Sequence, residues 1–278
     1  MTVGMVGLGL IGGSIVKSVR KYTDSIILGA DLDSQTLEKA ISDGTLNGKL
    51  TISNMGGCDV IMVAIPPRAT ARWIDENASY LCGTTLIDLC GVKRYICDIA
   101  RPLAEKYGFT FVGGHPMAGK EVSGYENADA DLFKNASMIL TPEGVCEEKV
   151  ATLRELFLTL GFGRVTLSTP DEHDNIISYT SQLAHIASNA YIKSPSAQKQ
   201  MGFSAGSYKD LTRVAKLDAS LWTELFACNR DYVTHELKVL IDNLNEYLSA
   251  LESEDDELLQ KLLQKGRELK LSADGIKQ

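Results

Sequence analysis

The feature that most constrains the fold is a glycine-rich segment between a strand and a helix at the start of the chain. The apolar run Thr2–Val6 predicts a buried strand, and it leads directly into Gly7-x-Gly9-x-x-Gly12. Apolar residues at helical spacing follow, and then a second apolar run, Ser25–Ala30. A strand, a tight glycine turn, a helix and a second strand in this order predict a β-α-β unit of the Rossmann type.

Each glycine of this segment has a separate mechanical role in such a unit. Gly7 permits the tight turn, Gly9 lets the backbone approach a pyrophosphate, and Gly12 lets the helix pack on the strand. The first turn of the helix, including Leu10 and Ile11, presents N–H groups and a partial positive charge to the phosphates. The segment therefore predicts a dinucleotide site. The alternative is a glycine turn that binds no ligand.

The residue that ends the second strand discriminates between dinucleotides. Asp31 stands 19 residues after Gly12 and can accept hydrogen bonds from the adenosine ribose hydroxyls. A carboxylate repels a 2′-phosphate, and no Arg or Lys occurs in Leu32-Asp33-Ser34. NAD is therefore the predicted cofactor, rather than NADP.

The sequence pattern changes near residue 167. Before it, short β-branched runs alternate with helical patterns, which predicts an α/β domain with a mainly parallel sheet over residues 1–167. After it, Thr169-Pro170-Asp171-Glu172 is a strong helix start, and no strand pattern follows. We therefore expect an all-helical domain over residues 168–278.

The helical half also suggests an oligomer. Leucines recur three or four residues apart between Leu221 and Leu251, with one longer gap, and this spacing predicts a single helix of about eight turns. A helix this long buries its apolar face only against other helices, which a second subunit can supply. We therefore expect a homodimer formed through the C-terminal helices.

Composition excludes several classes of protein. The 278 residues carry 28 Lys and Arg against 36 Asp and Glu, a formal net charge of −8, which argues against nucleic acid or anionic membranes as partners. No apolar run approaches the roughly 18 residues of a membrane span, and no signal-peptide pattern is present. The six cysteines form no Cys-x-x-Cys pair and lie near no His at zinc-ligand spacing, so no metal site is predicted. These features predict a cytoplasmic protein.

One histidine is placed for chemistry. His115 follows the predicted strand Phe109–Val112, and the carboxyl ends of parallel strands border the ligand crevice. Pro116 holds its backbone extended, and two preceding glycines leave room for a close approach. A neutral imidazole here can accept a proton from a substrate hydroxyl. The alternative is a histidine with a structural hydrogen bond.

The first helix of the second half carries a polar stripe. Ser178, Ser181, Gln182 and His185 share one face by helical spacing, on a helix that is otherwise apolar. Buried polar groups need partners, which a cleft between two domains can provide. The alternative for His185 is a core histidine bonded to a backbone carbonyl.

These segments together resemble prephenate dehydrogenases, and the related arogenate dehydrogenases, of tyrosine biosynthesis. The resemblance runs over nearly the whole chain. It rests on GLGLIGGS at 7–14, GGHPMAG with Glu121 and Ser123-Gly124 at 113–124, Met138–Pro142, His173-Asp174, Ser181–His185, and Asp210–Arg213 followed by Trp222.

The resemblance implies the oxidative decarboxylation of prephenate to 4-hydroxyphenylpyruvate with NAD. It implies that His115 accepts the proton of the 4-hydroxyl and that Arg213 holds a substrate carboxylate. His185, Glu121 and Gln182 are implied to contact the substrate. Two departures from the family pattern are Gly91, where a Ser is usual, and Gln182, where a His is frequent.

Three alternatives stay open at this point. An arogenate dehydrogenase differs in a charged amine on the substrate side chain. Another hydroxyacid dehydrogenase of the same plan would carry a catalytic Lys on its first inter-domain helix, and Pro170–Tyr191 contains none. The third alternative is a catalytically silent NAD-binding regulator, although both His115 and Arg213 are present.

Overall fold

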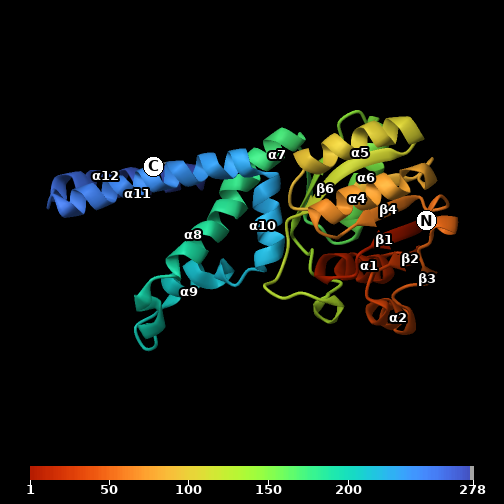
Figure 1. Cartoon of the computed structure of the whole chain (residues 1–278), viewed down its shortest axis with the longest axis horizontal. Helices are drawn as coiled ribbons and strands as arrows, with labels where there is room; N and C mark the ends of the chain where they lie inside the picture. The colour runs from red at the N-terminus through yellow and green to blue at the C-terminus, as the bar shows by residue number, and fades with distance from the viewer. Residues whose placement is uncertain (276–278) are drawn as a thin grey trace. The chain divides into compact units, whose positions relative to one another are not determined.

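The computed structural model describes residues 1–275 and contains one eight-stranded sheet (Figure 1). The strand order is β3-β2-β1-β4-β5-β6-β7-β8; β1 to β6 are parallel, β7 is antiparallel to β6, and β8 is parallel to β7. The bounds are β1 Thr2–Val6, β2 Ile26–Ala30, β3 Gly48–Lys49, β4 Val60–Val63, β5 Thr85–Asp88, β6 Thr110–Pro116, β7 Ser137–Thr141 and β8 Arg164–Leu167. The predicted Rossmann-type α/β architecture is confirmed.

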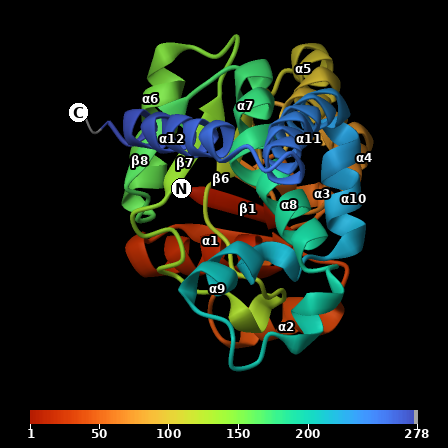
Figure 2. The same ribbon diagram turned by 90° about the vertical axis from the view of Figure 1, so that its left-hand side faces the viewer.

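Helices cover both faces of the sheet, and the sheet is therefore buried on both sides. Figure 2 shows α1 and α6 on one side and α4 and α5 on the other. The apolar core splits accordingly into two clusters, one on each face. The bounds are α1 Leu10–Tyr22, α2 Ser34–Ser42, α3 Ile52–Met55, α4 Pro67–Asn77, α5 Arg94–Tyr107 and α6 Glu147–Thr159.

Between residue 168 and residue 275 the chain forms helices and no strand, as predicted. Thr169 caps the first of them, since its hydroxyl accepts a hydrogen bond from the Glu172 N–H at 3.1 Å. The helices are α7 Pro170–Ile177, α8 Ala184–Tyr191, α9 Gly206–Thr212 and α10 Ala219–Cys228. Ser178–Leu183, between α7 and α8, is a π-helical turn.

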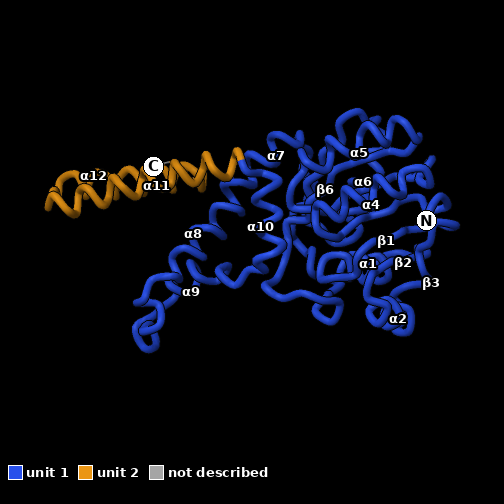
Figure 3. The backbone as a smooth tube through the Cα atoms, viewed as in Figure 1, with its two compact units in different colours: residues 1–230 blue, residues 231–278 orange. Residues whose placement is uncertain are grey.

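Among the described residues, 1–230 form one compact unit and 231–275 form another (Figure 3). The second unit consists of most of α11 Arg230–Glu252 and of α12 Asp256–Ala273. These two helices contact each other, since Tyr247 donates a hydrogen bond to the Leu262 carbonyl at 3.3 Å. The predicted division at residues 167/168 is a different one and stays a prediction.

The single long helix predicted across the leucine stripe is wrong. The stripe is divided between α10 and α11, and the chain leaves the helical conformation at Asn229. Asn229 is fully buried and its side chain is drawn into hydrogen bonds with Asp174, Gln182 and Arg94. Leucine spacing could not show this, because the break is caused by contacts distant in sequence.

No helix among residues 1–275 is both long and apolar enough to cross a membrane. In the same part of the chain, no three His, Cys, Asp or Glu side chains gather closely enough to hold a metal ion.

Candidate active site

The glycine turn after β1 has the geometry that each glycine requires. Gly7 has a φ of +86°, and a Cβ there would lie 2.6 Å from the Ala64 carbonyl oxygen. A Cβ on Gly12 would lie 1.9 Å from the carbonyl oxygen of Gly7, so the helix can pack this closely only without one. At Gly9, a Cβ would meet none of the described atoms within 4 Å, so the turn is open here to a ligand. Leu10 and Ile11 form the first turn of α1.

Asp31 lies directly beyond β2 and is tied to this turn. One carboxylate oxygen accepts a hydrogen bond from the Leu8 N–H at 2.6 Å, and the other accepts one from the Asp33 N–H at 2.8 Å. Each carboxylate oxygen can accept a second hydrogen bond, and the side chain is partly exposed. Asp31 can therefore hold ribose hydroxyls and the glycine turn together.

His115 lies inside β6 rather than in a loop, because the antiparallel strand β7 pairs with its backbone opposite Ile139. The two preceding glycines are required by crowding within the protein. A Cβ on Gly113 would lie 3.1 Å from the Lys93 side chain, and one on Gly114 would lie 2.8 Å from a backbone oxygen, that of Asp88. The close approach that these glycines permit is made by groups of the protein itself, among them Thr141, Lys93 and the Asp88 backbone.

Behind His115 stands a buried chain of polar groups. The Nδ1 atom of His115 lies 2.8 Å from Nε2 of His173, and Nδ1 of His173 lies 2.7 Å from Oδ1 of Asp174. The Asp174 carboxylate also accepts the backbone N–H groups of Lys93 at 2.7 Å and Arg94 at 2.9 Å, at the start of α5. His173 is 2% exposed and Asp174 is 0% exposed, so neither is available to a ligand.

A second buried pair sets the electrostatics of this end of the sheet. The Lys93 ammonium pairs with Asp88 and donates to the Gly114 carbonyl oxygen at 2.5 Å, with both charged side chains fully buried. Burial lowers the pKa of His115 well below its ordinary 6.5, and His173 and Lys93 lower it further. The His115 imidazole is therefore neutral near neutral pH and is able to accept a proton.

A second group of predicted residues gathers on the helices. His185, on α8, stacks on Trp222 of α10 with ring centroids 3.7 Å apart. Its Nδ1 donates a hydrogen bond to the Ser181 carbonyl oxygen at 2.9 Å, and its Nε2 takes no part in this hydrogen bond. Burial lowers the pKa of His185, and the nearby charge of Arg213 lowers it too.

Arg213 follows α9, and its guanidinium pairs with the carboxylate of Glu121. Both side chains are solvent-accessible: Arg213 is 65% exposed and Glu121 is 38% exposed. The guanidinium is therefore held in place by a carboxylate that a substrate carboxylate can replace.

Gln182 does not join this group. It is 2% exposed, accepts a hydrogen bond from Asn229 at 2.7 Å, and donates to the Leu225 carbonyl oxygen at 3.5 Å. The single polar face predicted for residues 178–185 assumed α-helical spacing throughout. The π-helical turn Ser178–Leu183 breaks that spacing, so Gln182 and His185 have different neighbours.

Helix α10 lies between the two groups. Its Leu225 would lie 3.4 Å from a Cβ on Gly91, and the same Cβ would lie 3.8 Å from His115 Nε2. Helix α10 also contacts the start of α4, because the Arg68 N–H donates a hydrogen bond to the Glu224 carboxylate of α10. The absent side chain at Gly91 therefore leaves the Nε2 side of His115 less crowded.

Sequence reasoning missed the contacts of His173, Asp174 and Asn229. In the sequence, His173 and Asp174 form part of the motif set that carries the family resemblance, and the one local signal is a His-Asp pair in the first turns of a capped helix. The contact with His115 joins residues 58 positions apart, and no local pattern indicates it.

Comparison with known proteins identifies the family. The profile described as "Prephenate dehydrogenase, nucleotide-binding domain" matches residues 15–167, and "Prephenate dehydrogenase, dimerization domain" matches residues 169–265. The chain belongs to the prephenate dehydrogenase family. As a member of that family, it is related to dehydrogenases over both its sheet and its helical part.

Individual relatives agree. The chain is 29% identical to a prephenate dehydrogenase of Bacillus subtilis, over 93% of this chain and 72% of that protein. It is similar to a crystal structure of Synechocystis arogenate dehydrogenase, with a TM-score of 0.80 and 25% identity over 98% of this chain and 100% of the other. It is also similar to prephenate dehydrogenase from Aquifex aeolicus in complex with hydroxyphenyl propionate and NAD+, with a TM-score of 0.81 and 26% identity over 98% of both chains.

Proposed function

We propose that the protein oxidises and decarboxylates prephenate to 4-hydroxyphenylpyruvate. NAD is the cofactor and, when bound, takes up the hydride that leaves the ring carbon. The observation that carries the proposal is the position of His115, a neutral imidazole at the carboxyl edge of a dinucleotide-binding sheet. β6 is three strands away from β1, about 14 Å across the sheet, a distance that an extended dinucleotide can span.

The open turn at Gly9 supports a pyrophosphate site, because the backbone can be approached there without a clash. Gly7 and Gly12 shape the turn, the N–H groups of Leu10 and Ile11 would bind the phosphates, and Asp31 would accept hydrogen bonds from the ribose hydroxyls. All of these residues lie at the carboxyl ends of β1 and β2.

In the proposed mechanism, His115 accepts the proton of the substrate 4-hydroxyl while the hydride leaves the ring carbon that bears this hydroxyl. The ketone so formed is conjugated through the ring and withdraws electrons from the C1–carboxylate bond. Carbon dioxide leaves, and the electrons of the broken bond move through the ring to the ketone oxygen, so the ring becomes aromatic. The phenolate oxygen then takes up a proton, which His115 can return. The Arg213 guanidinium releases the Glu121 carboxylate and binds a substrate carboxylate instead. His185, which stacks on Trp222, contacts the substrate near Arg213.

The direct test is the formation of NADH, followed by absorbance, with prephenate and with arogenate as parallel substrates. The proposal expects turnover of prephenate with NAD and release of one carbon dioxide for each NADH. Absence of NADH with both substrates would contradict the proposal and would favour a catalytically silent NAD-binding regulator. Family membership and the presence of His115 and Arg213 argue against such a regulator.

One observation keeps arogenate as the second candidate. An amine on the substrate side chain needs an acidic partner, and the structure places the Glu121 carboxylate against Arg213. If arogenate is the substrate, Glu121→Gln lowers kcat/KM for arogenate while changing that for prephenate much less. The Synechocystis relative named an arogenate dehydrogenase is consistent with this candidate.

Replacement of Asp31 is expected to change cofactor preference. Asp31→Ala removes the carboxylate that binds the ribose and repels a 2′-phosphate, so the ratio of kcat/KM with NAD to that with NADP falls. Asp33→Ala is the matched control, since Asp33 caps α2 through the Gln35 N–H and makes no contact with Leu8. An unaltered ratio in Asp31→Ala would remove Asp31 from the ribose site.

The acidic limit of activity is expected below pH 6.5. His115 works as a base only when neutral, so activity is lost as the pH falls through its pKa, and burial lowers that pKa well below the ordinary value. The acidic limb of kcat/KM, which reports the free enzyme, should therefore lie below 6.5. A limb at or above 6.5 would be at odds with this environment for His115.

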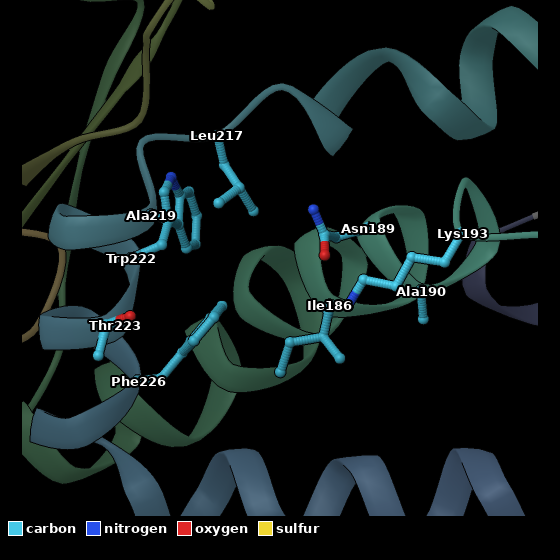
Figure 4. Close-up of a pocket in the computed structure, with 9 residues that line it drawn as sticks. All are labelled: Ile186, Asn189, Ala190, Lys193, Leu217, Ala219, Trp222, Thr223 and Phe226. Atoms are coloured by element: carbon cyan, nitrogen blue, oxygen red, sulfur yellow. The ribbon is translucent and has the colours of Figure 1, made fainter.

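A homodimer is also proposed, from apolar surface on the helices. Ile186, Leu217, Trp222 and Phe226 line a cavity of about 280 Å³ between α8 and α10, with Lys193 at its border (Figure 4). In the second unit, Leu244, Leu248 and Leu251 of α11 are each more than half exposed. The match of residues 169–265 to a dimerization domain supports a second copy as the partner. Sedimentation should give twice the chain mass of 30.2 kDa; a species of the single mass would contradict the proposal.

A further inference from the structure

The buried His173–Asp174 pair has no access to a ligand, yet it is bonded to the proposed base. His115, His173 and Asp174 are joined by contacts of 2.8 Å and 2.7 Å, and the two residues behind His115 are 2% and 0% exposed. A buried histidine and a buried carboxylate are costly unless every polar atom is satisfied. Each of these buried polar atoms therefore needs a donor or an acceptor opposite it, and this requirement fixes which atoms carry protons.

The carboxylate fixes the first proton. Asp174 already accepts two backbone N–H groups, from Lys93 at 2.7 Å and Arg94 at 2.9 Å, so its oxygens act as acceptors. The nitrogen that faces it, Nδ1 of His173, must then carry a hydrogen and donate it. Burial lowers the pKa of His173, so this ring is neutral and its Nε2 is a bare acceptor.

The second proton follows from the first. Because Nε2 of His173 has only a lone pair, the hydrogen of the 2.8 Å contact must belong to Nδ1 of His115. A neutral His115 that carries its proton on Nδ1 has none on Nε2. The Nε2 atom faces Gly91, where a Cβ would still be 3.8 Å away.

We propose that His173 and Asp174 are positioning residues that fix His115 as its Nδ1–H tautomer, so that Nε2 is the atom that receives the substrate proton. This inference rests on the proposed function for its catalytic meaning. The direction of the hydrogen bonds follows from the structure alone.

The same chain responds when the proton arrives. His115 becomes a cation at Nε2 while Nδ1–H still donates to His173, whose own Nδ1–H donates to the Asp174 carboxylate. The charged groups around the two rings are Lys93, its partner Asp88, Asp174 and Arg94, which also faces Asp174. Lys93 is paired with Asp88. The Asp174 carboxylate, which Arg94 also faces, is the anion that is hydrogen-bonded through His173 to the new cation.

The tautomer can be observed directly in the full-length protein without substrate or cofactor. The chain has four histidines, so a ¹⁵N-histidine-labelled sample gives few long-range ¹H–¹⁵N patterns, and single His→Gln variants assign them. We expect His115 and His173 each to show a protonated Nδ1 and an unprotonated Nε2 at pH 7. A protonated Nε2 on His115 overturns the proposal. Since no turnover is measured, this result is independent of whether prephenate is the substrate.

Variants then connect the tautomer to the rate. In Asp174→Asn the side-chain amide can donate to His173, which reverses both hydrogen bonds and places the His115 proton on Nε2. We expect kcat to fall by about 10³–10⁴-fold, as when a triad carboxylate is made neutral. Asp171→Asn is the matched control, because Asp171 is an exposed carboxylate of the same helix and also faces Arg94. It should leave the His115 pattern and kcat unchanged.

Substitution of His173 separates positioning from packing. His173→Gln retains a carbonyl oxygen that can accept from His115 Nδ1, and His173→Leu retains only bulk. We expect the Gln variant to keep the His115 tautomer and at least tenfold more kcat than the Leu variant. Equal loss of kcat in both variants, with the His115 tautomer unchanged in both, would show that His173 acts only by packing and would overturn the assignment. Asp174→Asn also changes the group that accepts the Lys93 and Arg94 N–H groups at the start of α5. For this reason the wild-type spectrum is the first test.

Discussion

The His115→Asn variant is expected to lower kcat by about 10²–10⁴-fold with only a modest change in KM. An asparagine amide can occupy the place of the imidazole Nδ1 and still meet His173, which lies 2.8 Å from that atom. It has no group at the place of Nε2, so the proton acceptor is removed while the strand β6 and its pairing are kept. The measurement is steady-state NADH formation at saturating prephenate and NAD.

A matched substitution controls for this loss. His235→Asn makes the same chemical change at an exposed histidine of α11, outside the proposed site. It should retain wild-type kcat. Near-wild-type turnover of His115→Asn would refute the role of His115 as proton acceptor, whatever the turnover of His235→Asn.

The Arg213→Ala variant is expected to act mainly on KM. Loss of a charge-assisted contact to a substrate carboxylate costs on the order of 2–4 kcal/mol, which is about 30- to 1,000-fold in KM. The structure adds a second reason for a large effect. Without Arg213, the Glu121 carboxylate faces the incoming substrate carboxylate with no cation between them.

This second contribution can be separated from the first. In Arg213→Ala combined with Glu121→Gln, the repulsion is gone and KM should be lower than in Arg213→Ala alone. Arg213→Lys retains the charge but not the planar fork and should lie between wild type and Arg213→Ala. An unchanged KM in Arg213→Ala would place this residue outside the substrate site.

Local requirements could be predicted from the sequence. The glycine turn has a positive φ at Gly7, and the atom nearest to a Cβ on Gly12 would be the carbonyl oxygen of Gly7, so most of its requirements lie within residues 7–12. The Rossmann-type order of strands and helices follows from alternating apolar patterns in the same way. The short strands β3 and β8 carry no clear strand pattern, since β3 has two residues and β8 is mostly exposed.

Contacts between distant segments could not be predicted. His173 meets His115 only because α5, α7 and β6 converge, and the helix break at Asn229 has its cause in partners 47 and 55 residues away. The π-helical turn before α8 buries Gln182, which helical spacing places on one face with His185 and for which the family resemblance implies a substrate contact. The roles given to His115, His185, Arg213 and Glu121 stay predictions, whereas their positions are now described.

A crystal structure with NAD and 4-hydroxyphenylpyruvate would show which side chain meets the hydroxyl whose proton is transferred. We expect Nε2 of His115 within about 2.6–3.2 Å of the 4-hydroxyl oxygen, with the Arg213 guanidinium on a carboxylate. A product hydroxyl bound by another side chain, with His115 turned away from it, would refute the role of His115 as the proton acceptor.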